Sequence, residues 1–101
     1  MKLESKIFRE MLQEELERQE RLEQMYLRDL EKLPKGSIQV KKLNGKEYYY
    51  LMYRDGNSVK SNYIQGNDID IIKEKILERR QIEKLLKQIK LDIKSMRKVV
   101  K

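Results

Sequence analysis

The chain has 101 residues, enough for one domain, and 41% of them are charged, against a norm of roughly 25%. It has no Cys and no His, which excludes disulfides, thiolate nucleophiles and the commonest metal ligand. The net charge of +7 is uneven: residues 1–33 carry seven basic and nine acidic side chains, residues 34–66 six and two, and residues 67–101 eleven and six. This basic excess makes a polyanion a candidate partner, while a solvated lysine-rich surface is the alternative interpretation.

Residues 2–33 contain neither Gly nor Pro, and the spacing of their apolar positions predicts that the first 33 residues form an amphipathic helix. Glu14 and Arg18 have the i,i+4 spacing of an exposed ion pair. Pro34 ends the helix. The apolar positions recur mostly at steps of three or four residues, with Gln19 filling one gap, and are Phe8, Leu12, Leu16, Leu22, Tyr26, Leu30 and Leu33.

Residues 37–64 have a different character and are predicted to form a three-stranded antiparallel meander. Asn44-Gly45 is the strongest short hairpin signal in the chain. A two-residue loop there pairs Lys42 with Glu47, a favourable cross-strand pair that supports this register. One face then holds the more apolar set and should pack on the helix ends: Ile38, Val40, Tyr49, Leu51 and Tyr53.

The other face of this predicted sheet is basic and aromatic, and we expect it to look outward. It holds Gln39, Lys41, Leu43, Lys46, Tyr48, Tyr50, Met52 and Arg54. The third strand depends on the second turn. A three-residue loop, Asp55-Gly56-Asn57, places Val59 and Tyr63 inside and Lys60 outside, and a two-residue loop reverses this. We favour the three-residue loop because it buries the apolar pair.

Residues 67–100 are predicted to form a second helix, with Asn67 or Asp68 as its N-cap. Its seam steps 4, 3, 4, 3, 4, the period of a coiled coil, through Ile82, Leu86, Ile89, Ile93, Met96 and Val100. Ile72 and Ile76 extend the seam backwards. The predicted fold class is therefore α+β: a single domain, 1–101, in which an antiparallel hairpin of long helices carries the inserted meander.

Several apolar residues lie off these seams, and two helices alone leave some of them in water, which favours a homo-oligomer. They are Leu3, Ile7, Met11, Met25, Leu27, Leu77, Leu85 and Leu91.

Exposed tyrosines beside lysine and arginine suit nucleic acid, because rings stack on bases and cations neutralise phosphate. The candidate nucleic-acid-binding residues are Lys41, Lys46, Tyr48, Tyr50, Arg54 and Lys60. The partner is expected to be a nucleic acid or a nucleoprotein complex. The same composition suits a protein partner, which leaves an adaptor role open. A purely structural oligomer, with the tyrosines as cross-strand packing, is the third interpretation.

No catalytic motif is present, so we expect no enzyme, no metal and no cofactor. Asp68, Asp70 and Glu74 resemble a cation site, but they lie at a predicted helix N-terminus, where acidic residues are common. No apolar run approaches the ~18 residues of a membrane span, and no signal-peptide pattern opens the chain. We therefore expect no membrane partner and a cytoplasmic location.

The meander motif Gly45-Lys46-x-Tyr48-Tyr49-Tyr50-Leu51-x-Tyr53-Arg54-Asp55-Gly56 resembles an uncharacterised family of small bacterial and phage mobile-element proteins. The resemblance covers residues 34–66 and implies a meander flanked by helices. Small mobile-element proteins of this size include inhibitors of host defence of the anti-CRISPR type, and this chain is compatible with that role. The tyrosine-rich strand, basic turn and lysine-rich third strand are also similar to the arm-type DNA-binding domain of phage integrases, which lacks a long first helix.

Overall fold

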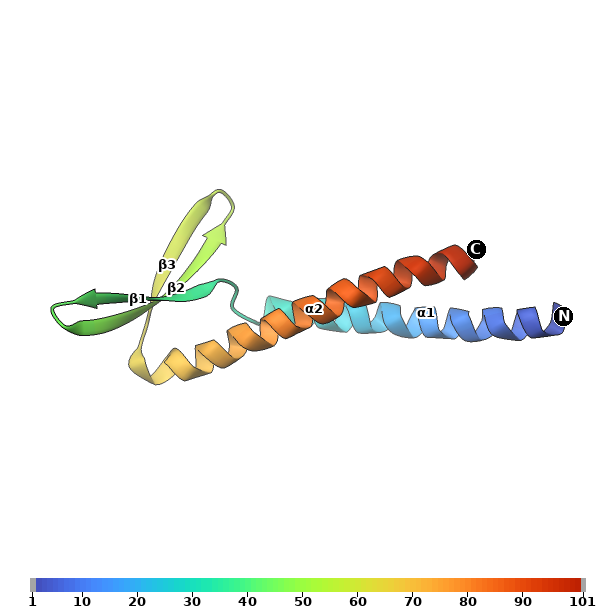
Figure 1. Cartoon of the computed structure of the whole chain (residues 1–101), viewed down its shortest axis with the longest axis horizontal. Helices are drawn as coiled ribbons and strands as arrows, with labels where there is room; N and C mark the ends of the chain where they lie inside the picture. The colour runs from blue at the N-terminus through green and yellow to red at the C-terminus, as the bar shows by residue number, and fades with distance from the viewer. Residues whose placement is uncertain (1, 101) are drawn as a thin grey trace. The chain divides into compact units, whose positions relative to one another are not determined.

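The structure is a computed structural model that describes residues 2–100, and the side chains of residues 5–100. Its fold class is α+β, as predicted, and in chain order the meander lies between two long helices (Figure 1). The chain divides into two compact units, residues 2–31 with 82–100, and residues 32–81. The elements in chain order are α1 (Lys2–Glu31), β1 (Ser37–Leu43), β2 (Lys46–Asp55), β3 (Ser58–Ile64), a 3₁₀ turn η1 (Gly66–Asp68) and α2 (Ile69–Val100).

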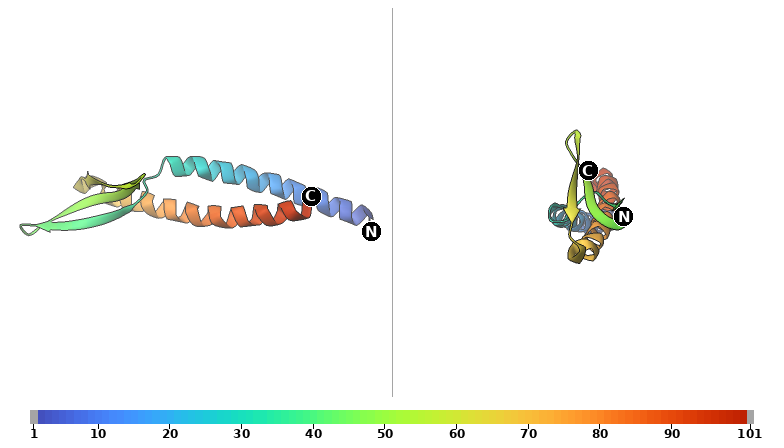
Figure 2. Two further views of the ribbon diagram at one scale, coloured as in Figure 1. Left: turned by 90° about the horizontal axis from the view of Figure 1, so that it is seen from above. Right: turned by 90° about the vertical axis from the view of Figure 1, so that its left-hand side faces the viewer.

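The first unit is an antiparallel helix pair, formed by α1 and the C-terminal part of α2 (Figure 2). Leu16, Ile89 and Ile93 form its buried cluster. Both predicted helical seams supply this core, because apolar residues three and four apart share one face of a helix. The residues that pack around the cluster are Leu22, Tyr26, Met96 and Val100, and Ile82 and Leu86 are also buried.

The first turns of α1 depart from the prediction. Phe8 belongs to the predicted seam, but its side chain is 58% exposed, and Ile7 and Met11 beside it are exposed as well. The reason is the offset of the pair, in which Arg97 Nη2 lies 3.0 Å from Glu20 Oε2. With that offset, the first turns of α1 extend past the last turn of α2 (Figure 2).

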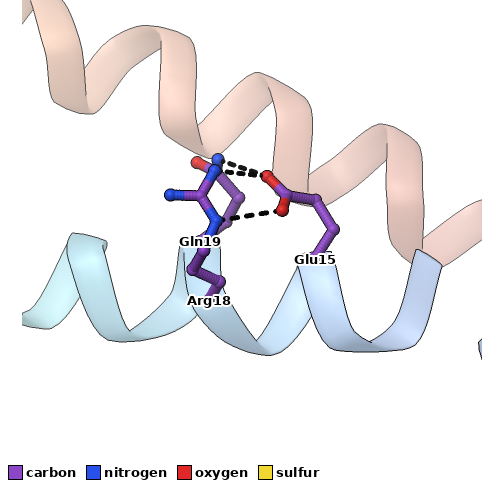
Figure 3. A network of polar contacts seen from close by, with 3 residues as sticks. All are labelled: Glu15, Arg18 and Gln19. Carbon is purple, nitrogen blue, oxygen red and sulfur yellow. Dashed lines mark hydrogen bonds and ion pairs between the residues drawn. The ribbon is translucent and has the colours of Figure 1, made fainter. Parts of the chain in front are cut away.

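A polar network on the surface of α1 also differs from the prediction (Figure 3). Arg18 pairs with Glu15, at 2.6 Å between Nη2 and Oε1, and not with Glu14. Arg18 Nε also donates to Glu15 Oε2 over 2.9 Å, and Gln19 Nε2 donates a third hydrogen bond to Glu15, 3.0 Å long. The hydrogen bonds from Arg18 and Gln19 lower the pKa of Glu15 from 4.5 to about 2, because they stabilise its charged form.

The second unit contains the meander, whose strands are ordered β1-β2-β3. The predicted register of the first hairpin is confirmed, with Val40 opposite Tyr49 and Lys42 opposite Glu47. Asn44 and Gly45 both have positive φ, 54° and 78°, which a two-residue type I′ turn requires.

Gly36 lies just before β1 at a φ of 112°. A Cβ at this position would clash with the backbone oxygen of Met52. Only glycine therefore allows the chain to approach β2 so closely where the first hairpin begins.

The predicted register of the third strand is wrong. Asp55 pairs with Ser58, so the second turn has two central residues, Gly56 and Asn57, and not three. Only Gly56 has positive φ there, 61°, as in a type II′ turn with glycine first. A loop one residue shorter transfers every β3 side chain to the opposite face of the sheet.

The second helix begins two residues later than predicted. Residues 66–68 form the η1 turn, in which the Asp68 amide donates to the Gln65 carbonyl over 2.9 Å. Within the same unit, Arg79 Nη1 donates to the Leu33 carbonyl oxygen over 2.8 Å. Ile64 and Ile76 are the buried apolar side chains among the described residues of this unit.

Candidate nucleic-acid interface

Side chains alternate across each strand, so the observed register assigns every strand residue to one of two faces. We call the first the mixed-charge face: Ile38, Val40, Lys42, Glu47, Tyr49, Leu51, Tyr53, Asp55, Ser58, Lys60, Asn62 and Ile64. We call the second the cationic face: Ser37, Gln39, Lys41, Leu43, Lys46, Tyr48, Tyr50, Met52, Arg54, Val59, Ser61 and Tyr63.

Three tyrosines cluster on the cationic face. The centroid of the Tyr63 ring lies 6.4 Å from that of Tyr48 and 5.7 Å from that of Tyr50, with tilted and edge-on geometries. Such offset arrangements are favourable for aromatic rings. Tyr48 and Tyr50 are half-buried, while Tyr63 is 57% exposed. The cluster therefore presents aromatic surface to solvent, chiefly through Tyr63.

The cations of this face lie around the tyrosine cluster. Lys41 Nζ is 4.8 Å from the centroid of the Tyr50 ring, close enough for a cation–π interaction. Lys46 and Arg54 lie on β2, at the two ends of the row that contains Tyr48 and Tyr50. All three cations are exposed. No carboxylate lies on the cationic face, because both acidic residues of the strands are on the other face.

On the mixed-charge face, the lysines and the carboxylates form ion pairs with one another. Lys60 Nζ lies 2.9 Å from Asp55 Oδ2, and Lys42 Nζ lies 3.9 Å from Glu47 Oε1. The Tyr49 hydroxyl donates to Glu47 Oε2 over 3.2 Å. This hydrogen bond, together with the negative charge of Glu47, raises the pKa of Tyr49.

The same face also carries the apolar contacts of the sheet. Ile64 is buried, and Tyr49, Leu51 and Tyr53 are half-buried. Lys73 Nζ of α2 lies 5.9 Å from the centroid of the Tyr49 ring. A groove of about 300 Å³ there is lined by Ser37, Ile38, Lys73, Ile76, Leu77 and Arg80. The more apolar predicted face is thus the one beside the first turns of α2.

The structure brings five of the six predicted site residues together on the cationic face: Lys41, Lys46, Tyr48, Tyr50 and Arg54. The sixth, Lys60, lies on the mixed-charge face, because the second turn is one residue shorter than predicted. Tyr63 lies on the cationic face, where Lys60 was predicted to lie, and Val59 lies on that face as well. The signal for this was the dipeptide Gly56-Asn57, which is itself a two-residue turn sequence.

The described residues offer few other kinds of site. Within residues 5–100, no group of three or more Asp and Glu side chains is placed to hold a metal ion. In the part of the chain that the structure describes, neither helix has an apolar stretch of the length and hydropathy that a bilayer crossing requires. The cationic face is the candidate site that the sheet provides.

Comparison with known proteins gives a family but no function. Residues 12–74 match the family described as Domain of unknown function (DUF6788). No curated protein and no solved structure matches the chain. The matched segment contains the whole meander, most of α1 and the first turns of α2. Because the match covers more than half of the chain, the protein belongs to the DUF6788 family.

Proposed function

We propose that this protein is a non-enzymatic binding protein that takes single-stranded nucleic acid, free or within a nucleoprotein complex, on the cationic face of its meander. The observation that carries the proposal is the segregation of charge on the sheet. Both strand carboxylates lie on the mixed-charge face, where they pair with Lys42 and Lys60. Lys41, Lys46 and Arg54 have no carboxylate on their own face to neutralise them.

Each part of the cationic face has a chemical role in this proposal. Lys41, Lys46 and Arg54 contact backbone phosphates, which supplies affinity without sequence preference. The exposed ring of Tyr63 stacks on a base, and Tyr48 and Tyr50 pack beside that ring on the same face. Stacking needs bases that are free of a duplex stack, and for this reason the proposed ligand is single-stranded.

The test compares two double variants that each remove two exposed cations from the same sheet. Lys41→Ala with Arg54→Ala removes charge from the cationic face, and Lys42→Ala with Lys60→Ala removes it from the mixed-charge face. Binding of labelled single-stranded DNA and RNA is measured by fluorescence anisotropy over a salt series. The first variant should weaken binding by roughly tenfold or more at low salt, and lower the slope of log K against log salt by about 1.4.

The control variant should retain near-normal affinity, because its lysines are engaged with Asp55 and Glu47. Equal losses in the two variants would mean that net charge alone attracts the strand. Absence of binding by the unmodified protein at low salt would remove the proposal altogether.

A finer form of this proposal is a phage or mobile-element inhibitor of host defence, of the anti-CRISPR type, acting on a guide-bound nuclease. It is supported by the resemblance of the meander motif to small mobile-element proteins and to the integrase arm-binding domain. Cleavage by a purified guide-bound nuclease, measured with and without the protein, tests it. Inhibition should be lost in the Lys41→Ala, Arg54→Ala variant, and unimpeded cleavage at saturating protein would exclude it.

A second candidate function is a homo-oligomer or adaptor that associates through its helices. Exposed apolar side chains off the seams favour it: Ile7, Met11, Met25, Leu77, Leu85 and Leu91. Leu27, also predicted to lie off the seams, is half-buried, and the side chain of Leu3 is outside the described residues. Light scattering over a concentration series tests this candidate, and a constant monomer mass would exclude the oligomer.

A further inference from the structure

The C-terminal half of α2 carries a row of lysines with regular spacing. Lys84, Lys87, Lys94 and Lys98 follow the steps 3, 7 and 4, with Leu91 occupying the position that divides the step of seven. This is a period of 3.5 residues, so the four side chains lie along one face of the helix. We call these four residues the lysine row. At 1.5 Å per residue, it is about 21 Å long.

This face of α2 is exposed and has one acidic neighbour, Glu83, which lies four residues before Lys87 at the N-terminal end of the row. All four lysines are exposed, and none forms an ion pair with a carboxylate of residues 5–100. Asp92 is the one acidic residue between Lys84 and Lys98. At about 100° per residue, it points to the other side of the helix. There it is half-buried and accepts a hydrogen bond of 2.9 Å from Gln88 Nε2.

A shallow groove extends the positive surface along one side of the row. It has a volume of about 400 Å³ and is lined by Glu23, Lys90, Ile93, Lys94, Arg97 and Lys98. Four of these six residues are cations, and one of them, Arg97, is held by Glu20 at 3.0 Å. The remaining three ammonium groups lie close together with a single carboxylate, Glu23, beside them.

The outer surface of α1 shows that this pattern is not general to the helices. Acidic and basic side chains are both present there, and Arg18 is paired with Glu15. Residues 1–33 carry a small acidic excess, with nine acidic and seven basic side chains. Mixed signs are what solubility alone requires of a surface helix. The single sign of the lysine row distinguishes it from the surface of α1 and suits a ligand of opposite charge.

We infer that the lysine row is a second binding site, separate from the sheet, for the phosphate backbone of double-stranded nucleic acid. No aromatic residue lies on α2, so this surface cannot stack on bases. A straight row of ammonium groups on a rigid helix suits a rigid polyanion with regularly spaced charges, and its length spans about six base pairs. The contacts go to phosphate only, so this binding does not depend on sequence.

The experiment uses two fourfold variants of the full chain with equal net charge. Lys84, Lys87, Lys94 and Lys98 are each changed to Gln in the first variant. The matched control changes four exposed cations of α1 to Gln: Lys6, Arg9, Arg21 and Arg28. Glutamine keeps helix propensity close to that of lysine, and circular dichroism checks the helix content of both. Anisotropy then measures binding to a duplex of about 20 base pairs over a salt series.

The row variant should bind the duplex roughly 100-fold or more weakly at low salt, with the salt slope reduced by about 3 to 4. The α1 variant should retain most of the affinity and slope of the unmodified protein. Equal losses in the two variants would overturn the inference. So would binding of the unmodified protein to vesicles of anionic lipid in the absence of binding to the duplex.

The two variants test this inference and the proposed function independently of each other. The Lys41→Ala, Arg54→Ala variant should still bind the duplex through α2, and the row variant should still bind a single strand through the sheet. If only the sheet variant lost the duplex, the lysine row would not be the site.

Discussion

The two faces of the meander carry almost the same residue types and use them in opposite ways. Each has tyrosines and lysines, yet the mixed-charge face engages its tyrosines and lysines internally. Tyr49 donates to Glu47, and Asn62 Nδ2 donates to the Tyr53 hydroxyl over 3.4 Å. On the cationic face, the tyrosines contact one another and Lys41 only through their rings. The placement of both strand carboxylates on one face is enough to leave the other face with cations as its only charged side chains.

The largest expected effect concerns the register of β3, on which the composition of both faces depends. Ile64 is 4% exposed and Val59 is 60% exposed. Ile64→Ala should therefore lower the free energy of unfolding by about 2–5 kcal/mol, and Val59→Ala should change it by less than about 0.5 kcal/mol. Urea unfolding followed by circular dichroism measures both.

If Ile64→Ala fails to fold, the smaller change Ile64→Val is used instead, and it should lower the free energy of unfolding by about 0.5–1.5 kcal/mol. A Val59→Ala variant that is the more destabilised of the two would indicate the three-residue loop, and would exchange the two faces of β3.

The next effect separates the tyrosines of the two faces in ligand binding. Tyr63→Ala should weaken single-strand binding by about 1–3 kcal/mol, because its exposed ring is the proposed stacking surface. Tyr63→Phe should keep most of the affinity, since stacking uses the ring and not the hydroxyl. Tyr53→Ala, on the mixed-charge face, is the control. Anisotropy titrations measure all three, and equal weakening by Tyr53→Ala would contradict the division of the sheet.

A smaller effect is expected when the two carboxylates of the mixed-charge face are replaced by neutral amides. Asp55→Asn with Glu47→Gln frees Lys60 and Lys42 from their carboxylates. Affinity for a single strand should rise by a few-fold, because two further cations become available. The stability of the fold should change by less than about 1 kcal/mol, as exposed ion pairs contribute little. Unchanged affinity would show that the ion pairs of Lys42 and Lys60 are not the reason why this face does not bind the strand.

The smallest effect is a titration shift on the mixed-charge face. Glu47 raises the pKa of Tyr49 by accepting its hydroxyl proton in a hydrogen bond and by its charge. Glu47→Gln should move that pKa back towards 10, the ordinary tyrosine value. Because the folded-state pKa is raised, this contribution to stability is complete below the unfolded-state pKa, and is lost as pH rises through the folded-state value. Absorbance titration of Tyr49→Phe beside Glu47→Gln identifies the group.

Much of this fold could be predicted from local pattern. The spacing of Ile82, Leu86, Ile89 and Ile93 requires one buried stripe on a helix, and all four are buried. Asn44-Gly45 specifies a two-residue turn because few other pairs tolerate two positive φ values, and that register is confirmed. Five of the six candidate site residues follow from that turn alone, since alternation along β1 and β2 then assigns their face.

The misplaced residues share one cause, which is that their positions depend on an offset between elements. The length of the second turn decides which face holds Lys60, Val59 and Tyr63. The three-residue turn was predicted because it would bury Val59 and Tyr63, and that criterion was wrong. Phe8 depends on where α1 lies along α2, which no periodicity within α1 reports.

The amino-acid sequence by itself determined which residues face which way within each element: the helical seams, the three strands and the segregation of Lys41, Lys46 and Arg54 from Glu47. These follow from backbone geometry and repeat over a few residues. Only the tertiary structure decided how far the elements are shifted against one another, and which of the two turn lengths left open by the sequence is used, so that Tyr63, and not Lys60, completes the cationic face. An offset is set by the sum of many contacts between elements, and a shift of one residue reverses which side chains meet the solvent.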